Sequence, residues 1–263
     1  MGNGITLEAV LKRDRMVVVF GLAGVATLSW AYMFYLAWGM KEMNMGMEMA
    51  MPRMHAWGVV DFVLMFIMWS VMMVAMMVPS VAPMVLIFAT VNRKRREQQV
   101  PFISTGMFLL GYLAVWTGFG ALATLAQWGL HTAALLSSMM VGTSPILGGI
   151  LLLAAGIFQL TPLKYACLAH CRSPLGFIMT EWREGARGAF TMGLRHGRYC
   201  VGCCWILMTL LFVTGVMNLL WVAIIAAFVL IEKIVPGGLW ISRISGLLLI
   251  GWGVWMAAGT LVY

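Results

Sequence analysis

Apolar residues run along this chain in long stretches that short polar segments separate. Most stretches hold about 20 residues, the length that an α-helix needs to cross a hydrocarbon core of about 30 Å. The pattern predicts an all-α protein, a polytopic transmembrane helix bundle with about seven spans. The predicted spans are residues 16–38, 57–91, 102–128, 145–165, 200–217, 219–231 and 244–262. The sixth is short, and its separation from the fifth depends on Asn218, so a count of six is the alternative.

The polar segments between these spans are too short to form a second domain. We therefore expect residues 1–263 to form a single integral membrane domain. Residues 39–56 are predicted to be a methionine-rich outer loop. Residues 173–198 mix aromatic and basic residues, which predicts a segment lying along the inner membrane surface. The first apolar run has no small-residue cleavage site after it, so we expect it to remain as a permanent span.

Composition and charge agree with a membrane protein and indicate its orientation. Hydrophobic residues make up 62% of the chain and charged residues 10%, whereas soluble proteins have about 25% charged residues. With the N-terminus inside, the outer segments hold only Lys41 and Arg53. The inner segments hold Lys12, Arg13, Arg15, Arg93, Lys94, Arg95, Arg96, Lys164, Arg172, Arg183, Arg187, Arg195, Arg198, Lys233 and Arg243. The positive-inside rule therefore predicts an inner N-terminus, and the net charge of +8 gives no reason to expect nucleic-acid binding.

Methionine is concentrated in the predicted outer loop, which reads "GMKEMNMGMEMAMPRMH". The loop and its end contain Met43, Met45, Met47, Met49, Met51 and His55. The five methionines recur at every second residue, so an extended loop offers several thioethers to one ion. Thioether sulfur is a soft donor that suits Cu(I). The alternative interpretation is that methionine serves here only as a flexible apolar side chain.

The second predicted span continues the methionine pattern. At 100° per residue, one helical face carries Asp61, Met65, Met68, Met72 and Met76. An acidic residue at the outer end followed by thioethers predicts a soft-metal path that leads inward, and acidic residues within membrane segments are functional candidates. Packing against neighbouring helices is the alternative interpretation of this face.

All five cysteines fall in two short stretches, at the end of the fourth predicted span and the start of the fifth. Together with two histidines they form the groups Cys167, His170, Cys171 and His196, Cys200, Cys203, Cys204. Helical spacing brings the members of each group onto a shared face. Two such helix ends side by side would form a thiolate-rich metal site at the cytoplasmic face. The alternative is that these cysteines are small apolar core residues. The methionines favour copper as the metal, with zinc or iron as alternatives.

Three blocks of the sequence resemble a known family. They read "MMVPSVAPM", "QLTPLKYACLAHCRSPLGF" and "HGRYCVGCCWILM". They are similar to a bacterial family of predicted metal-binding integral membrane proteins, whose domain has no assigned function. The resemblance extends from about residue 57 to the last predicted span and implies a multi-pass protein of the bacterial inner (cytoplasmic) membrane with a metal site at the Cys/His positions. It supplies no catalytic residues, and the methionine-rich loop lies outside it.

Three functions fit these observations. The first is a copper-handling membrane protein that captures, passes or delivers a soft metal ion. The second is a copper or iron metalloenzyme, or an accessory or assembly subunit of a membrane oxidase or oxygenase complex. The third is thiol chemistry or the assembly of metal sites, although a reducing cytoplasm disfavours disulfide exchange at these cysteines. The expected partners are membrane lipids, together with a soluble metal-binding protein or a larger membrane complex.

Overall fold

The computed structural model describes residues 7–47, 57–97, 105–133, 135 and 144–259, and all regular structure within them is helical. The prediction of an all-α protein is confirmed. The helices are α1 (Leu7–Met47), α2 (Val59–Glu97), α3 (Thr105–Thr132), α4 (Pro145–Gln159), α5 (Pro162–Arg172), α6 (Pro174–Glu181), α7 (Gly185–Thr209), α8 (Leu211–Thr214), α9 (Leu219–Ile234) and α10 (Gly238–Gly259).

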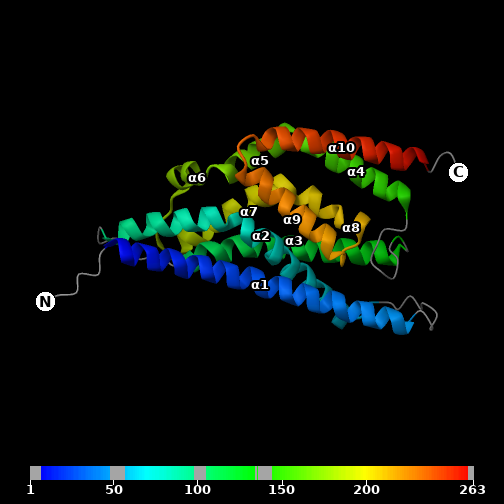
Figure 1. The fold of residues 1–263 in the computed structure, drawn as a ribbon, viewed down its shortest axis with the longest axis horizontal. Helices are drawn as coiled ribbons and strands as arrows, with labels where there is room; N and C mark the ends of the chain where they lie inside the picture. Colours follow the sequence, from blue (N-terminus) through cyan, green and yellow to red (C-terminus); the bar gives the residue numbers. More distant parts are fainter. Residues whose placement is uncertain (1–6, 48–56, 98–104, 134, 136–143, 260–263) are drawn as a thin grey trace.

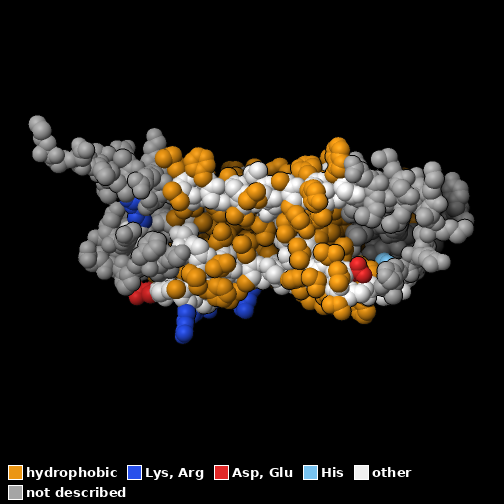
Figure 2. Space-filling model, turned by 90° about the horizontal axis from the view of Figure 1, so that it is seen from below, with side chains coloured by type: hydrophobic (Ala, Val, Ile, Leu, Met, Phe, Trp, Pro, Cys, Tyr) orange, Lys and Arg blue, Asp and Glu red, His pale blue; other side chains and the backbone are white. Residues whose placement is uncertain are grey.

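The long helices lie side by side along the longest axis of the molecule (Figure 1). Helix α10 packs along α4, α3 packs along α7, and α1 packs along α2. Helices α2 and α7 are the most buried of the long helices, whereas α1 and α10 are mostly exposed. Hydrophobic side chains cover the middle of the face shown in Figure 2, and basic side chains on that face lie toward the end where α1 begins.

The number of helices that could cross a membrane is lower than the seven predicted spans. Within the described residues, five helices are long and apolar enough, or six if the bent pair of α4 and α5 is one span. The difference has a physical cause, because the predicted sixth span corresponds to α9, which has only 16 residues. The predicted fourth span is divided, since the axes of α4 and α5 meet at 64°.

Proline and threonine explain the break between α4 and α5. Thr161 is the N-cap of α5, and its side chain accepts a hydrogen bond from the backbone N–H of Lys164 at 3.3 Å. Pro162 follows at the first helical position, where its missing N–H costs nothing. The same residue pair therefore ends one helix and starts the next in a new direction.

Helix α2 continues through Pro79 and Pro83. A proline inside a helix leaves the carbonyl four residues earlier without its donor, which for Pro79 is the carbonyl of Ala75. The indole Nε1 of Trp30 in α1 donates to this carbonyl at 3.2 Å. A side chain of the neighbouring helix therefore replaces the hydrogen bond that Pro79 removes.

Two predicted segments differ in the structure. Residues 185–198 were predicted to lie at the inner membrane surface, but they form the first half of α7, whose candidate span begins at Gly185. Of the predicted interfacial segment, only α6 and its flanking turns are separate from this long helix. Residues 39–47 were predicted to be a loop, but helix α1 continues to Met47.

Glycines allow α3 and α7 to approach closely. A Cβ atom at Gly193 would lie 2.0 Å from the carbonyl oxygen of Phe108, and one at Gly111 would lie 2.2 Å from that of Phe190. These positions fix α7, which carries three of the five cysteines, against α3.

We predict that Gly193→Ala destabilises the protein by about 1–3 kcal/mol, the usual cost of overpacking, because the backbones of α3 and α7 must separate. Thermal unfolding in detergent measures the change. Gly118→Ala on the exposed side of α3 is the control, since nothing lies within 4 Å of its added Cβ. Equal melting temperatures for the two variants would contradict the prediction.

Candidate metal centre

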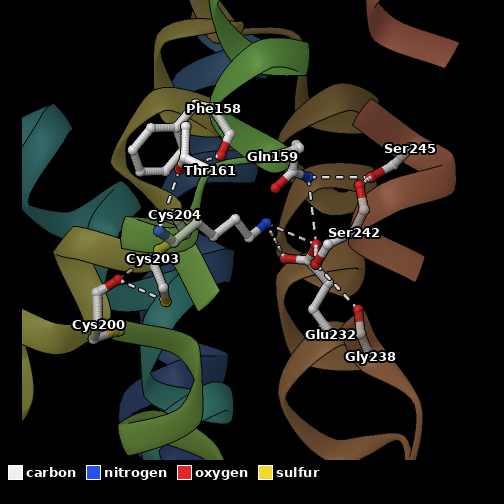
Figure 3. Close-up of polar contacts among 11 residues, drawn as sticks. Phe158, Gln159, Thr161, Cys200, Cys203, Cys204, Glu232, Gly238, Ser242 and Ser245 are labelled. Carbon is white, nitrogen blue, oxygen red and sulfur yellow. Dashed lines mark hydrogen bonds and ion pairs between the residues drawn. The ribbon is translucent and has the colours of Figure 1, made fainter. Parts of the chain in front are cut away.

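Four of the five cysteines are buried together between α5 and α7, and only Cys167 is partly exposed. The thiol of Cys171 in α5 lies beside those of Cys200 and Cys203 in α7. The Sγ atoms of Cys203 and Cys204 donate to the backbone oxygen of Cys200 at 3.1 and 2.9 Å (Figure 3). The structure therefore joins cysteines from both predicted groups into one thiol cluster, defined here as Cys171, Cys200, Cys203 and Cys204.

The position of the cluster along α7 differs from the predicted one. Cys200 to Cys204 lie near the middle of the candidate span Gly185–Thr214, rather than at its inner end. The reason is the continuity of α7, which begins 15 residues before Cys200. The thiols are therefore core groups of the bundle.

One cation and one hydroxyl contact the sulfur of Cys200. The Nζ of Lys233 in α9 lies 2.9 Å from this Sγ, and the hydroxyl of Tyr112 in α3 lies 3.0 Å from it. Lys233 also donates to the Oγ of Ser80 in α2 at 3.0 Å. A positive charge and a thiol thus lie in direct contact inside the bundle, where α2, α3, α7 and α9 meet.

The predicted methionine face is buried, but it is not distinct from the rest of α2. Met68, Met72 and Met76 are buried, and so are other methionines of the same helix outside the predicted face, namely Met73, Met77 and Met84. Met65 is half-buried, and its sulfur accepts a hydrogen bond from Gln127 at 3.7 Å. Burial therefore extends over the methionines of α2 in general and does not single out the predicted face.

Met77 contacts Ser80, a neighbour of the thiol cluster. The Oγ of Ser80 lies 3.9 Å from the sulfur of Met77 and donates to its backbone oxygen at 2.9 Å. The predicted face contained the adjacent Met76 instead. Helical periodicity alone does not distinguish these two positions, because the partner helices decide which side of α2 meets the thiols.

The outer residues of the predicted path have other positions. The carboxylate of Asp61 accepts a hydrogen bond from the backbone N–H of Gly58 at 2.9 Å, so it caps the start of α2. Met43, Met45 and Met47 belong to α1. Met49, Met51 and His55 lie outside the residues that the structure describes.

The two histidines differ in position. His196 is buried one helical turn before Cys200, and its ring lies against those of Phe108, Tyr112 and Phe177, with no hydrogen-bond partner at Nδ1. His170 is exposed, and its ring stacks on Tyr199 at 4.2 Å. The structure therefore keeps His170 apart from the thiol cluster.

The arrangement of the cluster limits the metals that fit it. Among the described residues, no group of three or more His, Cys, Asp or Glu side chains is arranged to hold a metal ion. Cys203 and Cys204 direct their sulfurs at a backbone oxygen. Structural zinc sites require four ligands, whereas a two-coordinate ion requires only a pair such as Cys171 and Cys200.

A second buried polar network lies beside the cluster (Figure 3). The Nζ of Lys164 in α5 lies 2.7 and 2.9 Å from the two carboxylate oxygens of Glu232 in α9. Ser242 in α10 donates to the same carboxylate at 2.7 Å, and Gln159 in α4 donates to it at 3.3 Å. The four residues come from four helices, and Lys164 and Glu232 are 0% and 1% exposed.

This network corrects the assignment of two residues. Lys164 and Lys233 were counted as basic residues of the inner polar segments, but both are buried in the bundle. The sequence did not lead us to predict roles for Glu232, Lys233, Tyr112 and Ser80. The signal that identifies the first two is the pair of adjacent charges in "VLIEKIV", because charged residues within an apolar stretch mark functional or paired groups.

We predict that Cys167 reacts with N-ethylmaleimide before any other cysteine in the detergent-solubilised protein, because it alone is partly exposed. Mass spectrometry of peptides at increasing reaction times measures the order. Modification in denaturant is the control and should be uniform. Modification of Cys200 or Cys204 at the rate of Cys167 would contradict the buried cluster.

Comparisons with known proteins identify the family of the chain. Neither the curated proteins nor the solved structures contain a significant match. The model of the PpoB2 family, described as copper chaperones, matches residues 66–256. The matched range contains the thiol cluster, Lys233 and the Lys164–Glu232 pair, and it begins after the methionine-rich segment. This match confirms the expectation of a metal-related family, and the metal in the description of that family is copper. The chain therefore belongs to the PpoB2 copper chaperone family.

Proposed function

We propose that this chain is an integral membrane copper chaperone that holds Cu(I) between Cys171 and Cys200 and passes it to an acceptor. The observation that carries the proposal is that thiols of two helices lie side by side next to the buried ammonium of Lys233. Copper is here the cargo of the protein. The acceptor is a soluble metal-binding protein or a larger membrane complex.

Charge balance favours Cu(I) at this site. Two thiolates and one Cu(I) ion carry one negative charge in excess, and the ammonium of Lys233 at 2.9 Å from Cys200 neutralises it. A Zn²⁺ ion held by all four thiolates of the cluster would leave one negative charge without a partner. Burying an unpaired charge costs several kcal/mol, about the same range as breaking a buried ion pair. Soft thiolates also prefer Cu(I).

The apolar outer surface of the helices fits a membrane location. Five or six of the described helices are long and apolar enough to cross a membrane, and hydrophobic side chains cover the middle of the face shown in Figure 2. We propose that the protein lies in the bacterial inner membrane with its N-terminus inside. The basic residues that remain after Lys164 and Lys233 are excluded still support this orientation.

The methionines offer an approach to the thiols. Thioethers line α2 down to Met77, which contacts Ser80, and Ser80 contacts Lys233 beside Cys200. We propose that the methionine-rich segment 39–56 captures copper and that the methionines of α2 guide it toward the cluster. Each thioether is a neutral ligand, so it adds no buried charge to the path.

We predict that the purified protein binds about one Cu(I) per chain and that Cys171→Ser and Cys200→Ser each abolish tight binding, because a hydroxyl is a poor ligand for Cu(I). Titration against a chromophoric Cu(I) chelator under anaerobic conditions measures affinity and stoichiometry. X-ray absorption of the wild type is expected to show sulfur coordination with two ligands.

Cys167→Ser is the matched control for these variants, because Cys167 is partly exposed and lies outside the thiol cluster. It should bind Cu(I) as the wild type does. Unchanged copper content in Cys171→Ser and Cys200→Ser would refute the proposed site, and a site filled by zinc after growth with both metals would refute the copper assignment.

We predict that Lys233→Met weakens Cu(I) binding about 10- to 100-fold, the range found for groups that support metal ligands, because the charge of the two thiolates is no longer balanced. Lys233→Arg retains the charge and should bind more tightly than Lys233→Met. Chelator competition measures both affinities. If Met and Arg at this position give equal affinities, the charge of Lys233 has no part in binding.

A further inference from the structure

We infer that the Lys164–Glu232 ion pair is a positioning device that holds helix α5, and with it Cys171, against the thiols of α7. The effect of this positioning on Cu(I) affinity rests on the function proposed above. The positioning of α5 itself does not depend on metal and can be tested in the metal-free protein. Neither residue belongs to the thiol cluster, so their effect on it acts through the placement of α5.

Helix α5 is a short element that needs external anchors. It has 11 residues, and its axis makes an angle of 64° with that of α4. Isolated helices of this length are marginally stable in water. Cys171 is its penultimate residue, so any rotation or displacement of α5 moves this thiol relative to Cys200.

Both ends of α5 are tied to the end of α9. Near the start of α5, the Nζ of Lys164 bonds both oxygens of Glu232 at 2.7 and 2.9 Å. At its last residue, the guanidinium of Arg172 donates to the backbone oxygen of Val235 at 2.7 Å. The two anchors are eight residues apart on α5, and their partners, Glu232 and the C-cap residue Val235, are three residues apart at the end of α9. They therefore fix both the position and the direction of α5.

The carboxylate of Glu232 is itself held in place. Ser242 in α10 donates to it at 2.7 Å and Gln159 in α4 at 3.3 Å, and Gln159 also donates to Ser245 at 3.1 Å. The anchor of α5 is therefore braced from two further helices. Two apolar side chains in place of Lys164 and Glu232 would bury the same surface. They would not fix the direction of α5, because apolar contacts are not directional.

The next residue of α9 completes the connection. Lys233 follows Glu232 and contacts the sulfur of Cys200 at 2.9 Å. Consecutive residues of one helix thus carry the anchor for the α5 side of the site and the cation for its α7 side. The ion pair ties α5, which carries Cys171, to Glu232, and the next residue of α9, Lys233, contacts Cys200. The ion pair therefore sets the position of Cys171 relative to Lys233 and Cys200.

A second ion pair provides a matched control. Arg195 in α7 and Glu181 in α6 form a partly exposed pair, with side chains 38% and 22% exposed. It joins α7 to the helix after α5 and has no contact with Glu232 among the interactions of the described residues. Breaking it with Glu181→Gln removes one ion pair without loosening either anchor of α5.

The test compares four variants with the wild type. Lys164→Met and Glu232→Gln break the pair, Lys164→Glu/Glu232→Lys reverses it, and Lys164→Met/Glu232→Met replaces it with apolar side chains. The last variant is expected to fold even where a single variant does not, because apolar replacement of a buried ion pair is often neutral or stabilising. Thermal unfolding identifies the variants that remain folded.

The first readout uses metal-free protein. Alkylation followed by mass spectrometry should show Cys171 reacting about 10-fold faster or more in the apolar double variant, with Cys203 and Cys204 still protected, since α5 opens locally while α7 stays packed. Glu181→Gln should leave Cys171 protected. A folded apolar double variant in which Cys171 remains as protected as in the wild type would overturn the inference.

The second readout is Cu(I) affinity by chelator competition and coordination by X-ray absorption. We expect affinity to fall about 10- to 100-fold in the apolar double variant and to recover in the charge reversal relative to the broken pairs. Wild-type affinity in the folded apolar double variant would also count against the inference. A wild type that binds no Cu(I) would refute the proposed function alone, because the alkylation result does not depend on metal.

Discussion

A positive charge that contacts a thiol inside an apolar helix bundle is the constraint on which the site depends. Lys233 brings this charge to Cys200, and it can remain there only because Ser80 and the sulfur both accept its hydrogen bonds. A buried ammonium without hydrogen-bond acceptors would be too costly. The neighbouring charges of Lys164 and Glu232 neutralise each other, so the charge of Lys233 remains available to balance a bound anion or a metal–thiolate complex.

Much of the fold follows from local signals in the sequence. Long apolar runs predicted the helices, and the Ser144-Pro145 and Thr161-Pro162 pairs begin α4 and α5 as N-cap residues followed by proline. The number of membrane-crossing helices was overestimated because apolar length alone does not show where a helix bends or stops. Helix α9 ends at Ile234, before Pro236 and the positive φ of Gly237.

The site was predicted in part, and the errors have a common cause. Spacing identified the two cysteine groups, and the fold brings Cys171 to Cys200 and Cys203. The spacing of residues did not identify Tyr112 or Ser80, since a single hydroxyl in an apolar helix carries no periodic signal. Helical period also could not choose between Met76 and Met77. Such choices depend on which helices become neighbours, and that information is not local.

The shortness of α4 and α9 has a consequence for the surrounding lipid. With 15 and 16 residues, these helices are about 22 and 24 Å long, whereas a bilayer core is about 30 Å thick. In the membrane location proposed above, thinning of the bilayer near the short helices would relieve this mismatch. The guanidinium of Arg172, which lies at the end of α9, would draw lipid headgroups inward at the same place. In a bilayer, an ion at the thiols would therefore be separated from water by a thinner hydrocarbon layer on this side than a uniform membrane provides.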